Sequence, residues 1–208
     1  NVFVNLFLSN SASLEVAGRK VAFSQTTRYP WDGDIAIKVN GNAAGRFGMK
    51  IRIPGWVKGQ PVPSDLYYYT DGKRLGYTIT VNGQPTDGQL TDDGYFTINR
   101  KWKKGDVVRV HFDMEVRTVR ANNKVVADRG QISIERGPIV YAAEWPDNNF
   151  NIMNVLMNCQ PVFTLGTMSY DAFIADSLKH RLTQYNDLSI ETLTTPAQTL
   201  AYTKNGSL

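Results

Sequence analysis

The side chains of this chain that could perform catalysis or hold a metal ion are few and widely spaced. A zinc site needs His, Cys or carboxylate groups that converge at short spacing. The chain has two histidines, His111 and His180, and a single cysteine, Cys159, and neither histidine has another histidine or a cysteine near it in sequence. The sequence therefore predicts no metal site and no cofactor in this chain. A lone cysteine forms no internal disulfide, so we expect Cys159 to be a small buried hydrophobe.

Two carboxylates facing a sugar would be needed if this chain hydrolysed glycosidic bonds by the two-acid mechanism. Asp113 and Glu115 share one face of a predicted strand, and Glu135 and Glu144 lie further along the chain. Each of the four also fits an ordinary surface charge opposite a lysine or arginine. The motifs of nucleophile elbows and of phosphate-binding loops are absent from the sequence. We therefore predict no catalytic residue in this chain.

Aromatic side chains offer another kind of site, because their ring faces can pack on the apolar side of a sugar ring. The candidate substrate-binding residues of this kind are Trp31, Tyr67, Tyr68 and Tyr69. Burial at a domain interface explains the same residues at least as well. We therefore also expect Trp56 and the three tyrosines to lie on or near a surface that contacts another domain.

Composition and charge are those of an ordinary globular protein. Of the 208 residues 42% are hydrophobic and 20% are charged, and the net charge is +4. The densest basic group, 100–104, sits at a predicted turn and not on a continuous face, so no nucleic-acid partner is expected. No apolar run reaches the length that spans a membrane, so no membrane partner is expected either.

The start of the chain predicts a piece of a longer protein. It begins at Asn1 without a methionine and enters the strand-like segment Val2–Leu8 directly, with no signal-peptide pattern. The absence of disulfides is compatible with both cytoplasm and periplasm. The compartment stays open, with a periplasmic or extracellular location slightly favoured.

The segment Gly94–Arg117 has the clearest structural pattern. Its second half alternates between an apolar set, Val108, Val110, Phe112, Met114 and Val116, and a polar set, Arg109, His111, Asp113, Glu115 and Arg117. Such alternation predicts a strand with the first set buried and the second exposed to solvent. The turn-like residues 103–106 precede it and follow Tyr95–Arg100. The pattern therefore predicts a hairpin.

The same alternation recurs along the chain, around Ile35–Val39, Phe47–Ile53 and Ile132–Glu135. Asp-Gly and Asn-Gly pairs, among them Asp71-Gly72 and Asn82-Gly83, tolerate the positive φ of tight turns and separate these runs. We predict an all-β fold, an antiparallel β-sandwich of jelly-roll type. Its expected domains are residues 1–122, one complete sandwich, and 123–208, a second β unit truncated at its C-terminus. The excursion Val57–Gly76 is longer than a hairpin connection needs, so we expect it to be ordered, and either functional or packed against another part of the protein.

Six segments, in this order, resemble the C-terminal β region of glycoside hydrolase family 127, the β-L-arabinofuranosidase-like enzymes. They are Val2–Leu8 (VFVNLFL), Thr27–Gly33 (TRYPWDG), Arg52–Trp56 (RIPGW), Val81–Pro85 (VNGQP), Gly94–Val108 (GYFTINRKWKKGDVV) and Gly130–Tyr141 (GQISIERGPIVY). The resemblance covers roughly residues 1–145.

The resemblance implies an N-terminal six-hairpin α/α barrel that carries the active site, followed by β-sandwich domains. It places the cysteine nucleophile, the zinc-binding cysteines and the glutamates of that barrel upstream of the segment resembling VFVNLFL, so no such role is carried onto Cys159. The implied parent is a bacterial enzyme of carbohydrate metabolism that releases L-arabinofuranose or a related sugar from plant glycans through a zinc-bound thiolate.

The function expected of this chain is therefore that of a non-catalytic accessory region that packs on the barrel as its intramolecular partner. Two other hypotheses remain open. One is a stand-alone carbohydrate-binding module that binds oligo- or polysaccharide through Trp31 and Tyr67–Tyr69. The other is a structural or adhesive sandwich without any glycan contact.

Overall fold

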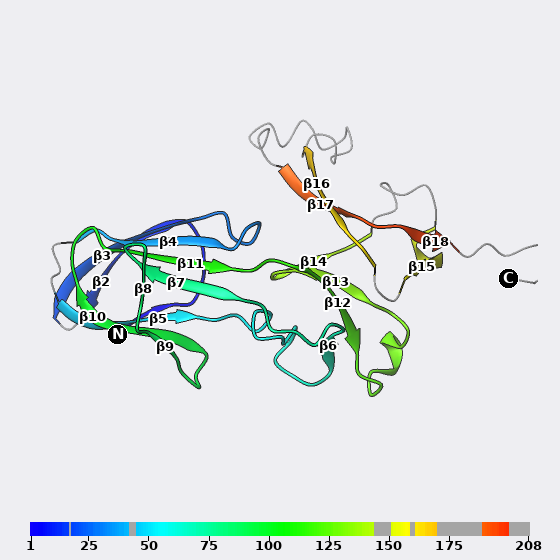
Figure 1. The fold of residues 1–208 in the computed structure, drawn as a ribbon, viewed down its shortest axis with the longest axis horizontal. Coiled ribbons are helices and arrows are strands. Elements are labelled where there is room, and N and C mark those ends of the chain that lie inside the picture. The colour runs from blue at the N-terminus through cyan, green and yellow to red at the C-terminus, as the bar shows by residue number, and fades with distance from the viewer. Residues whose placement is uncertain (17, 42–44, 144–150, 159–160, 170–188, 200–208) are drawn as a thin grey trace, which may run out of the picture. The chain divides into compact units, whose positions relative to one another are not determined.

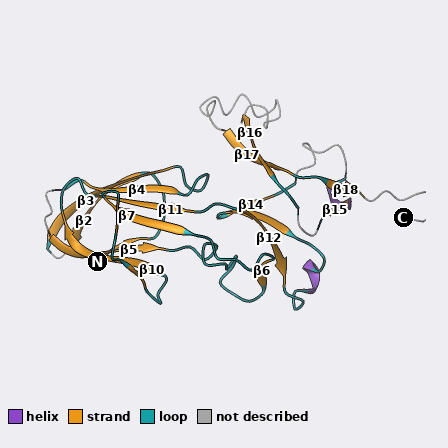
Figure 2. Cartoon of the chain, in the orientation of Figure 1, coloured by secondary structure: helices purple, strands orange, loops and turns teal. Residues whose placement is uncertain are grey.

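β-strands form nearly all the regular structure of this chain in a computed structural model (Figure 1, Figure 2). The structure describes residues 1–16, 18–41, 45–143, 151–158, 161–169 and 189–199. They fall into two units, Asn1–Val140 and Tyr141–Leu208. Within the described residues the only helical elements are two short 3₁₀ turns. The prediction of an all-β fold built mainly from antiparallel strands is confirmed.

Four strands form the first sheet, in the spatial order β1-β5-β10-β9. They are β1 (Val2–Val4), β5 (Gly45–Arg52), β10 (Tyr95–Trp102) and β9 (Gln89–Leu90). β1 runs parallel to β5, and the other neighbours are antiparallel. The predicted strand around Phe47–Ile53 is the centre of this sheet, with Met49 and Ile51 completely buried.

Six strands form the second sheet, in the order β2-β3-β4-β11-β7-β8. They are β2 (Asn10–Val16), β3 (Arg19–Thr27), β4 (Asp34–Val39), β11 (Val107–Phe112), β7 (Tyr77–Val81) and β8 (Gln84–Pro85). All neighbours in it are antiparallel. At the predicted Asn82-Gly83 turn between β7 and β8 both residues have positive φ, 54° and 75°, as a tight hairpin turn requires.

The core of the first unit lies between these two sheets. Val108, Val110 and Phe112 of β11 are at most 1% exposed, as their alternation predicted. Rings from opposite sheets meet edge to face, with centroids 6.2 Å apart for Phe23 and Phe47. This arrangement is a β-sandwich, because the alternating apolar faces of both sheets are buried against each other.

The predicted hairpin between β10 and β11 is wrong. The two strands belong to different sheets, and residues 103–106 carry the chain across the sandwich. Asp106 holds that turn, since its carboxylate accepts hydrogen bonds from the Lys103 N–H and the Asn82 side chain, both at 2.9 Å. The Gly105 N–H also donates to the Val39 carbonyl at 2.8 Å. Both strands carry an apolar face, and facing each other across the core buries both faces.

The predicted alternation also fails beyond Phe112. β11 ends there, and the chain enters a new strand, β12 (Val116–Ala121), in which Arg117 and Val119 are the buried positions. Arg117, expected to be exposed, is only 4% exposed, whereas Val116 is only partly buried. The break between the two strands shifts the alternation by one residue. Odd-numbered positions are therefore exposed in β11, as at Arg109 and His111, and buried in β12, as at Arg117 and Val119.

β12 lies in a third sheet, of order β14-β13-β12-β6. Its other strands are β14 (Ile139–Tyr141), β13 (Ser133–Arg136) and β6 (Tyr67–Tyr69), and the 3₁₀ turn η1 (Val126–Asp128) precedes β13. β6 comes from the Val57–Gly76 excursion, so the prediction that this segment is ordered and packed is confirmed. Its tyrosines lie opposite Val119–Ala121 of β12.

The described part of the second unit contains two antiparallel strand pairs. They are β15 (Val155–Met157) with β18 (Ala197–Thr199) and β16 (Thr164–Ser169) with β17 (Ser189–Thr194), and the 3₁₀ turn η3 (Ile152–Asn154) precedes β15. Cys159, His180 and Glu144 lie outside the described residues. The described residues contain no helix that is long and apolar enough to cross a membrane.

Replacement of Phe112 by alanine is expected to lower the free energy of unfolding by about 3–5 kcal/mol, because it removes a completely buried ring. Arg109, its exposed neighbour on β11, is the control, and its replacement by alanine should change stability by less than about 0.5 kcal/mol. Urea unfolding followed by tryptophan fluorescence measures both. Equal losses at the two positions would contradict the assignment of the buried face.

Candidate functional site

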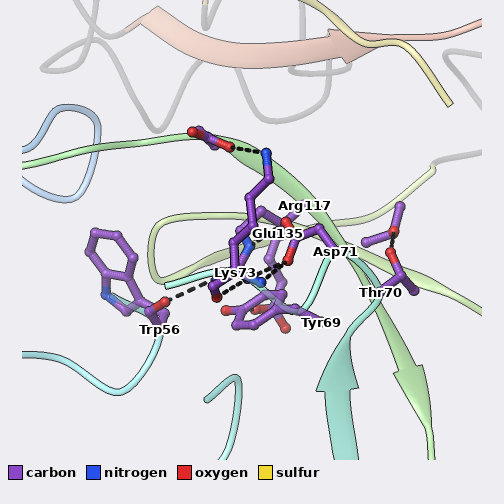
Figure 3. Close-up of polar contacts among 9 residues, drawn as sticks. Trp56, Tyr69, Thr70, Asp71, Lys73, Arg117 and Glu135 are labelled. Atoms are coloured by element: carbon purple, nitrogen blue, oxygen red, sulfur yellow. Dashed lines mark hydrogen bonds and ion pairs between the residues drawn. The ribbon is translucent and has the colours of Figure 1, made fainter. Parts of the chain in front are cut away.

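A buried arginine lies at the centre of a polar cluster beside β6 and β12 (Figure 3). The side chain of Arg117 is 2% exposed. Its Nε donates to Oδ2 of Asp71 at 2.9 Å, and its Nη2 donates to Oδ1 of the same carboxylate at 2.6 Å. Asp71 follows β6 by two residues, in the Asp71-Gly72 pair, whose sequence indicates a turn and gives no sign of this ion pair. The geometry is a bidentate pair, the strong form of arginine–carboxylate interaction.

The same guanidinium also binds two backbone carbonyls, one just before the 57–76 excursion and one near its end. Nη1 donates to the Trp56 carbonyl at 3.2 Å, and Nη2 donates to the Lys73 carbonyl at 2.8 Å. Arg117 therefore holds the two ends of the excursion to β12. A lysine could not make these contacts together, because its single ammonium lacks the planar fork of donors.

Tyr69 extends the cluster toward β13. The carbon centre of the Arg117 guanidinium lies 3.4 Å from the centroid of the Tyr69 ring, within the range of a cation–π interaction. The Tyr69 hydroxyl donates to Oε2 of Glu135 at 2.8 Å. Burial, with the neighbouring Glu135 carboxylate, raises the pKa of Tyr69, so this phenol stays a hydrogen-bond donor at neutral pH.

The two carboxylates of the cluster are shifted in opposite directions. The hydrogen bond from Arg117 lowers the pKa of Asp71, against the opposing effect of partial burial. Burial raises the pKa of Glu135, and the hydrogen bond from Tyr69 and the charge of Arg117 offset this only in part. Asp71 is thus the firmly ionised partner of Arg117, and Glu135 is the carboxylate that binds a proton more readily.

The outer part of the cluster adds weaker contacts. Lys73 lies 3.9 Å from Glu115 in an ion pair of two largely exposed side chains. The hydroxyls of Thr70 and Thr118 form a hydrogen bond between β12 and the end of β6 (Figure 3). Surface pairs of this kind contribute little stability. The groups of the cluster pair mainly with one another. The buried guanidinium binds Asp71, the Tyr69 ring and nearby backbone carbonyls.

The aromatic candidates separate into exposed and buried residues. Tyr68 is 49% exposed and Trp31 is 39% exposed. Tyr67 is partly buried, and its hydroxyl donates to Asp128 of η1 at 2.8 Å. The backbone carbonyl of Trp31 accepts a hydrogen bond from Arg136 at the end of β13. Tyr67–Tyr69 lie instead on β6, two strands away from β13 in the third sheet.

The expectation that Trp56 and Tyr69 lie on or near a surface that contacts another domain is wrong. They are 7% and 4% exposed and belong to the core cluster of the first unit. The Trp56 ring contacts Phe112 edge to face with centroids 5.8 Å apart, and its Nε1 donates to the Tyr29 hydroxyl at 3.3 Å. Tyr69 is covered by Arg117 on its ring face. Neither ring therefore has a free face, since the excursion folds back onto its own sandwich.

The acid and histidine positions considered in the sequence have ordinary partners where the structure describes them. His111 is exposed as expected, and its ring nitrogens lie 2.8 Å from an oxygen of Asp34 and 3.5 Å from one of Asp113. The described residues contain no group of three or more His, Cys, Asp or Glu side chains placed to hold a metal ion. They therefore do not fit the zinc site that the resemblance implies for a catalytic barrel.

Two family models match this chain in succession. The first, described as "Beta-L-arabinofuranosidase, GH127 middle domain", matches residues 1–114, and the second, "Glycoside hydrolase family 127 C-terminal domain", matches residues 116–192. This chain belongs to glycoside hydrolase family 127, as the six segments predicted. A domain boundary near residue 122 stays a prediction.

Individual relatives agree with the family models. The chain is 35% identical over 161 residues to the non-reducing end β-L-arabinofuranosidase of Bifidobacterium longum, an alignment that covers 74% of this chain and 21% of that protein. A solved GH127 β-arabinofuranosidase superposes with a TM-score of 0.83 at 47% identity, over 98% of this chain and 30% of the other. A GH127 β-L-arabinofuranosidase from Geobacillus stearothermophilus T6 gives a TM-score of 0.76 at 29% identity, over 99% of this chain and 28% of the other. The chain therefore spans less than a third of the length of these relatives.

Replacement of Arg117 by alanine is expected to lower the free energy of unfolding by about 3 kcal/mol or more, because it leaves Asp71 and two carbonyls without their partner. Arg117→Lys should recover only a minor part of this loss. The matched control is Arg120→Ala on the same strand, where the side chain is exposed. Urea unfolding of the three variants measures the difference, and a small loss at Arg117 similar to that at Arg120 would contradict the role of the cluster.

Replacement of Glu135 by glutamine is expected to stabilise the protein at neutral pH. The native pKa of Glu135 is raised above its unfolded value, so its ionisation costs stability as the pH rises from the unfolded pKa through the native one. The glutamine keeps an oxygen that accepts from Tyr69 and carries no charge. The gain should be present at pH 7.5 and absent at pH 4, as measured by urea unfolding. Glu115→Gln, at an exposed position, should show no such pH-dependent gain.

Proposed function

We propose that this chain is the non-catalytic β region of a glycoside hydrolase and supports a catalytic α/α-barrel domain of the same protein. The observation that carries this proposal is the succession of the middle-domain and C-terminal-domain family models along the chain. The short share of each relative that the chain spans supports it as well. In such an arrangement the chemistry belongs to a domain outside residues 1–208.

The polar cluster around Arg117 supports a mechanical role. Its buried groups are paired with one another, and they fix the 57–76 excursion against β12. A catalytic group needs a face open to substrate, whereas the Arg117 guanidinium is enclosed. A rigid excursion of this kind suits the task of holding a neighbouring domain in a defined position.

The substrate class of the parent protein follows from the names of its relatives. We infer that the parent acts on β-L-arabinofuranosides or related plant-glycan sugars, with a zinc ion in the barrel and none in this region. Its setting would be periplasmic or extracellular, where such glycans are encountered, and neither nucleic acid nor a membrane would be a partner. The intramolecular barrel is the proposed partner of the described surface.

A second candidate function is carbohydrate binding by this chain itself. The exposure of Trp31 and Tyr68 favours it, since both rings retain accessible surface. These residues lie on separate structural elements, the β3–β4 loop and β6. They would therefore serve as two separate contact points and not as one continuous platform.

The 208-residue chain is expected to show no glycosidase activity on aryl α- and β-L-arabinofuranosides, with or without added zinc and reductant. The measurement is release of the aryl alcohol by the purified chain. The same assay on the protein extended upstream through the barrel should show turnover. Hydrolysis by the chain alone that is lost on replacement of Glu135 or Cys159 would overturn the proposal.

A further inference from the structure

A polar cavity of about 430 Å³, half open to solvent, lies at the free side of β10, away from the Arg117 cluster. Its walls come from two stretches, residues 86–91 around β9 and residues 97–101 of β10. The volume is within the range of roughly 300 to 1,000 Å³ that is usual for small-molecule sites. Nothing in the proposed supporting role requires such a cavity.

The short length of β9 leaves this side of β10 open. β10 pairs with β5 along its full length, but β9 pairs only with Phe96 and Thr97. The Thr91 N–H donates to the Tyr95 carbonyl at 2.9 Å, so the polar backbone groups of Tyr95 face β9. Because these groups alternate in direction along an antiparallel strand, those of Asn99 and Lys101 face the same side. There they border the cavity without a described strand partner.

Several polar side chains of the cavity are also unpaired. Within the described residues, no hydrogen bond or ion pair engages five polar side chains that line it. They are Thr86, Asp87, Gln89, Asn99 and Lys101. Some charged groups elsewhere in the first unit have partners, as in the pair Lys50–Asp93. These mostly exposed groups are available to a ligand. The Oδ1 of Asn99 lies beside Gly48 of β5, so this exposed amide binds a ligand in the cavity by turning toward it.

The chemistry of this set selects the class of ligand. The carboxylate of Asp87 disfavours an anion, and Arg100 and Lys101 disfavour a cation. An apolar ligand would leave the amides of Gln89 and Asn99 without hydrogen bonds, at a cost in affinity. A neutral polyhydroxylated ligand satisfies them all, because each hydroxyl group both donates and accepts.

Two further features suit the wall to binding. Gly88 lies against the Phe96 ring, and a Cβ at this position would collide with that ring. Residues 86–91 therefore lie close to β10 at Gly88, and a larger residue there would increase the distance between this segment and the strand. The Thr97 hydroxyl is buried and has no hydrogen-bond partner, so no bond is lost if this side chain turns toward a ligand.

We propose that the cavity between residues 86–91 and 97–101 is a binding site for a short neutral saccharide, with Gln89 and Asn99 as its principal hydrogen-bonding residues. The site is independent of the proposed support of a barrel. It is also distinct from the exposed aromatic residues Trp31 and Tyr68, which take no part in it.

The test is a titration of the ¹⁵N-labelled 208-residue chain with neutral trisaccharides, namely arabinotriose, xylotriose and cellotriose, followed by amide chemical shifts. At least one should shift the signals of residues 86–91 and 97–101 at millimolar concentration. Gln89→Ala and Asn99→Ala should each weaken its binding by about tenfold or more. Gln84→Ala on β8, an exposed amide outside the cavity, is the matched control and should leave the affinity unchanged.

Several outcomes would overturn the proposal. They are the absence of shifts in these two segments with every neutral trisaccharide, unchanged binding in the Gln89 and Asn99 variants, and preferential binding of trigalacturonic acid that is lost in Lys101→Ala. The last result would identify an anion site. Failure of the saccharide-site proposal would not contradict the proposed support of the barrel. That support is measured separately, as an increase in the melting temperature of the barrel when this region is attached. The Gln89 and Asn99 variants should preserve that increase.

Discussion

The need to pair a buried guanidinium constrains the third sheet and the excursion that supplies its edge strand. Arginine keeps its charge under all ordinary conditions, so the 2% exposed side chain of Arg117 must find its partners inside the protein. It finds them in the Asp71 carboxylate and in the carbonyls of Trp56 and Lys73. These contacts bring the two ends of the excursion together, and β6 between them can then pair with β12.

The polar constraint continues directly into the apolar core. Trp56 offers its carbonyl to Arg117 and its ring to Phe112 of the second sheet. Trp56 is fixed through both its backbone and its side chain, so it links the position of the cluster to the packing of the sandwich. Leu75 adds a second link, since its N–H donates to the Val57 carbonyl at 2.8 Å and its side chain is buried. The excursion is thus an integral part of the first unit.

Sequence reasoning predicted what depends on local pattern and failed where the chain changes sheet. The alternation around β4, β5 and β11 and the Asn82–Gly83 turn follow from local rules, and the structure has them. The turn at 103–106 has the residues of a hairpin, yet only the packing of two apolar faces decides that its strands face each other. The alternation of Gly94–Arg117 places Arg117 on the exposed face, although Val119 two residues later indicates that this face of β12 is buried. The open side of β10 has no sequence signal, because it arises from the length of a different strand.

The open side of β10 also answers a requirement of the fold. A long exposed sheet edge invites pairing with other chains, and very short edge strands are one way to limit it. β9 covers only two residues of β10 and then leaves it, so the remaining edge borders a cavity lined by polar side chains. Lys101 and Asp87 there oppose the approach of a foreign apolar strand by their need for hydration. The same hydrated and unpaired groups are those that a saccharide can bind, so protection of the edge and capacity for a ligand have one physical origin.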